Sequence, residues 1–195
     1  MSLTKTDFNF SGVDHLIELS LMEDIGPGDI TTDLIIAQDH IVDAFWVAKS
    51  SGVISGLFVA EKVFRKLDNN IMWKPLVNEG EFVEKGNVIL EFSGQYRALL
   101  TGERTALNFA QRMSGISTMA HEYAKVLERT SCRILDTRKT LPAHRMLDKY
   151  AVKVGGGENH RIGLFDMVMI KDNHIQVAGG IKNAIEAVRK NLSND

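Results

Sequence analysis

The chain has 195 residues, of which 44% are hydrophobic and 25% are charged, and its formal net charge is −2 at pH 7. These proportions are ordinary for a folded globular protein and exclude a disordered chain. The small negative charge argues against a nucleic-acid partner, which requires a basic stripe across a domain. No run approaches about eighteen apolar residues, so we expect no membrane span and no membrane partner.

The number of cysteines indicates the redox state of the cellular compartment in which the protein is expected. The single cysteine, Cys132, cannot form an internal disulfide, and the amino-terminal residues lack the apolar core of a signal peptide. Both features favour a reducing cytoplasm. Because Cys132 opens a short apolar segment, we interpret it as a buried core thiol rather than a nucleophile.

Residues 1–105 predict an amino-terminal α+β domain. Apolar residues at helical spacing indicate one helix that ends at Gly26-Pro27-Gly28 and another over 57–69. A longer run of strand formers occupies 41–49. Three shorter strand segments are expected after it, at 71–73, 81–83 and 88–92.

Residues 106–195 predict the first part of an α/β barrel. Helical spacing continues from 101 to 130, and we expect one helix to end and a second to begin at Ser114-Gly115. Two short apolar strands are expected further on, at 134–135 and 167–170. Their separation is about that of one β-α-β unit. A closed barrel takes about 250 residues, so this part of the chain supplies only an incomplete one.

Cations follow both of these strands. Arg138 and Lys139 come after the first strand, Lys171 comes after the second, and a glycine triplet between them leads into His160 and Arg161. Residues just past the carboxyl ends of strands face the ligand in α/β barrels and sheets. We therefore expect Arg138, Lys139 and Lys171 at one mouth, where an anion offsets their repulsion. A mixture of arginine forks and lysine point charges favours a small polyanion that carries carboxylate and phosphate groups.

Seven segments lie in order along nearly the whole chain: MEDIGPGDITTD (22–33), AKSSGVISGL (48–57), NEGEFVEKGNVI (78–89), GERTALNFAQRMSGIST (102–118), DTRKTLP (136–142), KYAVKVGGGENHRIGLFD (149–166) and MIKDNHI (169–175). Together they closely resemble the quinolinate phosphoribosyltransferases. The resemblance implies an amino-terminal α+β domain, a phosphoribosyltransferase-type α/β barrel, and an active site at the barrel mouth near a dimer interface. It also implies transfer of phosphoribosyl from 5-phosphoribosyl 1-pyrophosphate to quinolinate, with decarboxylation to nicotinate mononucleotide for NAD biosynthesis.

By position, the resemblance also implies roles for the cations. Arg138, His160 and Arg161 are similar to the groups that hold the two quinolinate carboxylates. Lys139 and Lys171 are similar to the lysines that contact the phosphoribosyl substrate, where they can stabilise the departing pyrophosphate. These two lysines are therefore the candidate catalytic residues.

One further arginine and a metal complete the expectations. Arg104 matches an arginine that reaches into the partner subunit's site, which implies a homodimer or a larger oligomer with a shared site. Magnesium is implied together with phosphoribosyl pyrophosphate. We assign it no ligand in this chain, because the resemblance places the carboxylates for the magnesium-bound substrate on further strands that these 195 residues do not include. A lone His174 without a second ligand is a poor zinc site.

The sequence departs from the family pattern in two places. Family members commonly have Thr-Pro-Gly-Leu-Arg where this chain has Leu-Pro-Ala-His-Arg at 141–145. Their chains also continue with further strands that carry carboxylates for the magnesium-bound substrate, followed by glycine-rich phosphate loops. We therefore expect a truncated member that lacks the carboxyl-terminal third and is weak or inactive alone.

Alternatives from other classes stay open. The chain is also compatible with an inactive fragment that acts only in dimerisation, or with the related phosphoribosyltransferase-like protein associated with molybdenum transport. The KDNH and GGGENHR segments favour the quinolinate enzyme over the latter. Residues 78–92 resemble the strands of a biotinyl or lipoyl carrier, but the Met-Lys-Met turn of such carriers is missing.

Overall fold

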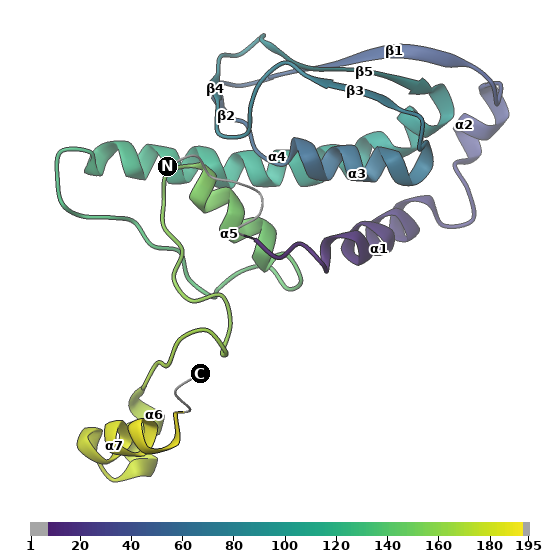
Figure 1. Ribbon diagram of the computed structural model, residues 1–195. Coiled ribbons are helices and arrows are strands. Elements are labelled where there is room, and N and C mark those ends of the chain that lie inside the picture. The colour runs from purple at the N-terminus through teal and green to yellow at the C-terminus, as the bar shows by residue number, and fades with distance from the viewer. Residues whose placement is uncertain (1–7, 193–195) are drawn as a thin grey trace. The chain divides into compact units, whose positions relative to one another are not determined.

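The computed structural model describes residues 8–192, and the chain divides into two compact units between His160 and Arg161 (Figure 1). The helices of the first unit are α1 (Val13–Ile25), α2 (Ile30–Ile35), α3 (Leu57–Leu67), α4 (Tyr96–Leu127) and α5 (Arg145–Val154). Its strands are β1 (Ile41–Val47), β2 (Gly52–Val53), β3 (Met72–Pro75), β4 (Phe82–Val83) and β5 (Val88–Gln95). The second unit contains α6 (Asp172–Ala178) and α7 (Ile181–Asn191).

The first unit is built on a three-stranded antiparallel sheet in the order β1-β5-β3. Side chains along β1 alternate between the two faces, as a sheet with one buried face requires. Helices α3 and α4 lie on the same face of this sheet (Figure 1). The small β2-β4 pair forms a separate antiparallel ribbon. The predicted mixed α/β architecture is thereby confirmed.

Aromatic rings fill the space between the sheet and α3. Phe64 of α3 is fully buried, and its ring centroid lies 5.3 Å from that of Phe92 in β5 and 6.1 Å from that of Trp46 in β1. Helix α4 approaches α3 closely at Gly102, where an added Cβ would lie 2.9 Å from the Leu67 side chain. Burial of these large rings is the main driving force for this core.

Helix α4 runs without interruption over 32 residues. The predicted break at Ser114-Gly115 is wrong. The Ser114 hydroxyl accepts a hydrogen bond from the Ser55 backbone N–H and donates one to the Ser55 carbonyl, both at 3.0 Å. A polar side chain that bonds to another element in this way does not compete for its own helix backbone.

The two predicted barrel strands have different outcomes. Leu135 forms an isolated parallel bridge with Glu158, whereas 167–170 belongs to no strand, so the prediction for that segment is wrong. A strand requires a neighbour for its backbone groups. None of the strands among residues 8–192 pairs with 167–170.

The prediction that Cys132 is buried is also wrong. Cys132 is exposed in the irregular connection that follows α4, where its backbone N–H donates to the Thr130 hydroxyl at 3.1 Å. Its apolar neighbours suggested a strand, but only Leu135 forms an isolated bridge there. As to membranes, no helix among the described residues combines the length and the apolar character that a bilayer crossing requires.

Candidate anion-binding site

Two neighbouring backbone segments position Arg138 and His160 in the first unit. The Asp136 N–H donates to the Glu158 carbonyl at 3.0 Å, and the Glu158 N–H donates to the Ile134 carbonyl at 2.9 Å. Because the segments run parallel, Arg138 and His160 each follow the same end of this short pair. The structure therefore brings together two segments whose paired residues, Leu135 and Glu158, lie 23 positions apart in the sequence.

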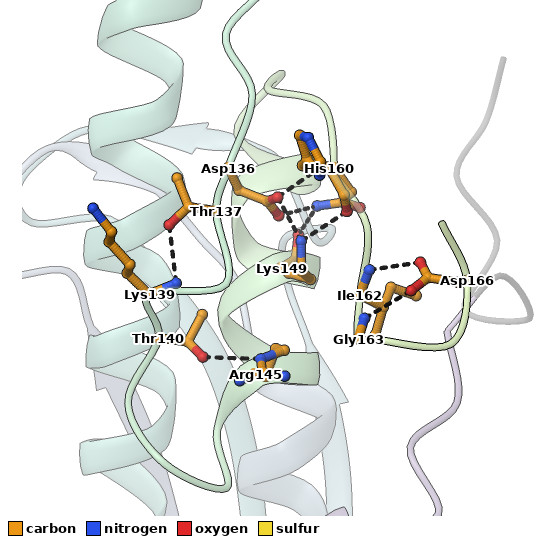
Figure 2. Close-up of polar contacts among 11 residues, drawn as sticks. Asp136, Thr137, Lys139, Thr140, Arg145, Lys149, His160, Ile162, Gly163 and Asp166 are labelled. Atoms are coloured by element: carbon orange, nitrogen blue, oxygen red, sulfur yellow. Dashed lines mark hydrogen bonds and ion pairs between the residues drawn. The ribbon is translucent and has the colours of Figure 1, made fainter. Parts of the chain in front are cut away.

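A cluster of polar groups joins Asp136, Lys149 and the backbone of His160 (Figure 2). The Lys149 ammonium donates to Asp136 Oδ1 at 2.5 Å and to the His160 carbonyl at 2.9 Å. The Asn159 amide donates to Asp136 Oδ2 at 2.7 Å and to the Lys149 carbonyl at 2.8 Å. The His160 N–H also donates to Asp136 Oδ1, at 2.8 Å. We call Asp136, Lys149 and Asn159 the buried triad, because the side chains of its central Asp136–Lys149 ion pair are almost fully enclosed, while Asn159 is half-buried.

Arg138 carries a buried hydrogen-bond donor that no described residue satisfies. Its Nε atom is buried and makes no hydrogen bond within the part of the chain that the structure describes. A buried guanidinium N–H without an acceptor costs about 1–3 kcal/mol or more, so such groups are normally satisfied. An anion bound at Arg138 would supply the acceptor.

Lys139 is arranged differently from Arg138. Its side chain is exposed, and Figure 2 shows it pointing away from the buried triad. The Lys139 backbone N–H donates to the Thr137 hydroxyl at 3.0 Å, which fixes the turn that carries it. An exposed ammonium on a fixed turn can reach a ligand phosphate without a cost of burial.

Arg104 lies on the exposed face of α4, in the half of that helix that packs on α3. Its predicted contribution to a partner subunit's site needs a second copy of the chain. That role stays a prediction.

The second unit carries Arg161 and Lys171. The Arg161 guanidinium donates to the Met167 carbonyl at 3.1 Å, and the Asp166 carboxylate accepts from two backbone N–H groups of the same loop. Lys171 is exposed and immediately precedes α6, where His174 Nδ1 accepts from the Lys171 backbone N–H at 3.0 Å. His174 therefore orients the start of α6. The predicted meeting of Lys171 with Arg138 and Lys139 stays a prediction.

Magnesium has no evident protein ligands here. Residues 8–192 contain no group of three or more His, Cys, Asp or Glu side chains that is arranged to hold a metal ion. Magnesium prefers carboxylate oxygens together with substrate phosphates. We therefore assign no magnesium ligand among residues 8–192 and no chemical step to the ion.

Two family models match almost the entire chain. Residues 29–114 match the amino-terminal domain of quinolinate phosphoribosyl transferase, and residues 116–195 match its carboxyl-terminal domain. The chain belongs to the quinolinate phosphoribosyltransferase family. The two matched regions meet inside α4.

Named relatives and solved structures agree with this family. The chain is 45% identical over 180 residues to the probable nicotinate-nucleotide pyrophosphorylase [carboxylating] of Synechocystis, covering 92% of this chain and 61% of the relative. The corresponding Bacillus subtilis protein is 45% identical over 175 residues, which cover 90% of this chain and 60% of that one.

The solved nicotinate-nucleotide pyrophosphorylase of Francisella tularensis superposes with a TM-score of 0.89 at 42% identity, covering 94% of this chain and 65% of that chain. The chain thus spans about three fifths of the length of the curated relatives it matches.

Sequence reasoning missed the buried triad. A signal was present at Lys149, because it lies on the apolar side of α5 between the buried residues Leu147 and Ala151. A lysine at a buried position is rarely found without a partner of opposite charge. The partner, Asp136, stands two residues before Arg138 in a segment that also resembles this phosphoribosyltransferase family.

In the segment 141–145, where the sequence departs from the family pattern, one non-glycine residue adopts an unfavourable backbone conformation. Ala143, which stands where quinolinate phosphoribosyltransferases commonly have glycine, adopts φ of 63°. A non-glycine residue in this left-handed region costs roughly 1–2 kcal/mol, part of which is offset by the greater freedom of glycine in the unfolded chain. We expect Ala143→Gly to raise the free energy of unfolding by roughly 0.5–1 kcal/mol, measured by urea denaturation. A loss of stability in Ala143→Gly would contradict this account of the turn.

Proposed function

We propose that the protein takes part in the transfer of phosphoribosyl from 5-phosphoribosyl 1-pyrophosphate to quinolinate, with decarboxylation to nicotinate mononucleotide. The observation that carries this proposal is the buried Arg138 Nε without an acceptor, at the end of the Leu135–Glu158 pair where His160 also lies. The names of the family relatives, carboxylating nicotinate-nucleotide pyrophosphorylases, support the same reaction.

Quinolinate carries two adjacent carboxylates, which suit a group of donors better than a single ion pair. In the proposal Arg138, His160 and Arg161 bind these carboxylates, and the planar fork of arginine gives them a fixed orientation. Correct orientation of the ring nitrogen towards the sugar is the main contribution of such residues to the rate.

The chemistry then needs positive charge where the leaving group departs. The bond from the anomeric carbon to pyrophosphate breaks and the ring nitrogen forms a bond to the same carbon. In the transition state the sugar has oxocarbenium character. Lys139 and Lys171 stabilise the charge that develops on the departing pyrophosphate. The carboxylate next to the new pyridinium nitrogen leaves as carbon dioxide, its bonding electrons enter the ring, and a proton replaces it.

Two further parts of the proposal concern partners. Magnesium would accompany the phosphates of the sugar substrate, where it would neutralise part of their charge, and we assign it no ligand among residues 8–192. Arg104 contributes to the site of a second copy in a homodimer or larger assembly. Both parts follow from the family, and the reaction of the whole protein is proposed to take place in the cytoplasm.

Quinolinate binding by the 195-residue chain tests the proposal. Calorimetric titration at low salt, where ionic attraction is least screened, is expected to show saturable binding that Arg138→Gln reduces by at least about 100-fold. The estimate assumes loss of a charged hydrogen-bonded contact worth about 3 kcal/mol. The matched control is Arg133→Gln, because Arg133 lies in the same segment but is 71% exposed and pairs with Glu158.

The two outcomes are distinct. Binding that survives Arg133→Gln and is lost in Arg138→Gln supports the proposal. A folded chain that gives no heat with quinolinate contradicts it and favours a role in assembly alone.

A further inference from the structure

The buried triad joins three separate segments of the first unit. Asp136 follows the Leu135 bridge, Lys149 lies in α5, and Asn159 precedes His160. The Asp136 carboxylate accepts from the other two segments, through the Lys149 ammonium of α5 and through the Asn159 amide and the His160 backbone N–H. One carboxylate therefore fixes the separation of the two backbone segments that carry Arg138 and His160.

The charge on Lys149 is not available to a substrate. Its side chain is 0% exposed, that of Asp136 is 6% exposed, and the two form an ion pair at 2.5 Å. The pair is neutral as a unit. Lys149 thus differs from Lys139, whose side chain is exposed.

Stability alone does not account for a buried ion pair at this place. Desolvation of two charges largely cancels their attraction, and replacement of such a pair by apolar side chains is often neutral or stabilising. The pair does fix the orientation of the His160 backbone, because Asp136 Oδ1 accepts from the His160 N–H and Lys149 donates to the His160 carbonyl. Both backbone groups of His160 are held by the triad.

We propose that Asp136, Lys149 and Asn159 are positioning residues, which hold Arg138 and His160 at the spacing that a vicinal dicarboxylate requires. The proposal rests on quinolinate as the ligand of the site. The triad itself touches no substrate and supplies no net charge. Its effect on binding is exerted through the backbone of 136–138 and 159–160.

Two variants test this role. Asn159→Ala removes both amide hydrogen bonds and leaves the Asp136–Lys149 ion pair in place. The double variant Asp136→Asn, Lys149→Met removes the two opposite charges together, so no lone charge is left buried. We expect each to weaken quinolinate binding by about 10-fold or more, since small displacements of positioned groups have effects on the order of 100-fold.

The matched control for lost stability is Asp68→Asn. Asp68 is buried and accepts from the backbone N–H groups of Asn70 and Gln95, at the opposite end of α4 from the triad. It is expected to lower the melting temperature while quinolinate affinity stays within about twofold of the starting protein. A merely structural triad would behave like this control: its variants would lower the melting temperature and leave quinolinate affinity within about twofold of the starting protein.

Hydrogen exchange supplies a readout that needs no ligand. In both triad variants the amides of 134–136 and 158–160 should exchange at least about 10-fold faster, while the amides of α3 keep their protection. Faster exchange with weakened binding supports the proposal. Unchanged exchange, or unchanged affinity in both variants, overturns it.

A starting protein that does not bind quinolinate overturns the inference and the proposed function together, whereas binding by the starting protein with unaffected variants overturns the inference alone.

Discussion

Gly155→Ala is expected to destabilise the first unit by about 3 kcal/mol, the upper end of the usual cost of overpacking. An added Cβ at Gly155 would lie 2.2 Å from the Ser117 carbonyl oxygen and 2.8 Å from the Ala120 side chain. The φ of −75° at Gly155 is ordinary for alanine. The whole effect therefore comes from forcing α5 away from α4.

Gly115→Ala is the matched control on α4. An added Cβ there meets no atom within 4 Å, and Gly115 lies inside the helix. Glycine in a helix interior is less favourable than alanine by about 1 kcal/mol, so Gly115→Ala should raise the free energy of unfolding by that amount. Urea denaturation of both variants measures the difference. Equal effects of the two substitutions would contradict close packing of α5 on α4.

Lys149→Met is expected to cost about 3–5 kcal/mol, because it leaves the Asp136 carboxylate buried without its cation. The ion pair is almost completely enclosed, so water cannot readily replace the lost ammonium. Adding Asp136→Asn to Lys149→Met should recover part of the loss, since no lone charge then remains. Thermal unfolding followed by circular dichroism measures both variants.

Lys74→Met provides the comparison for an exposed ion pair. Lys74 lies 2.7 Å from Glu91, but its side chain is 70% exposed. Exposed pairs contribute about 1 kcal/mol or less, so this variant should remain close to the starting protein. The buried-charge account fails if Lys149→Met is no more destabilising than Lys74→Met.

Most elements of residues 1–105 were predictable because their signals are local, but the short elements α2 and β2 were not predicted. Apolar periodicity identified β1 and α3, and turn residues separated β3, β4 and β5. The continuity of α4 was not predictable in this way. The partner of Ser114 is Ser55, 59 residues earlier in the chain, and no window around Ser114-Gly115 contains that information.

The candidate site was predictable only in part. Cations after apolar segments indicated Arg138, Lys139 and Lys171, and the resemblance added Arg104, His160 and Arg161. The buried triad escaped because its members look like ordinary polar residues until folding brings them together. Residues 167–170 were misassigned because a strand is defined by its neighbour rather than by its own composition.

The uninterrupted helix α4 has a consequence for how the protein can be divided. One half packs on α3 and the sheet, while the other half receives α5 through Ser117, whose hydroxyl donates to the Ala151 carbonyl at 2.7 Å. The two family domains nevertheless meet within this helix. Dividing the protein at this boundary would leave each fragment with half of α4. Each half would lose part of the apolar surface on which it packs. The boundary between the two family domains is therefore not a boundary between independently folding parts of this chain.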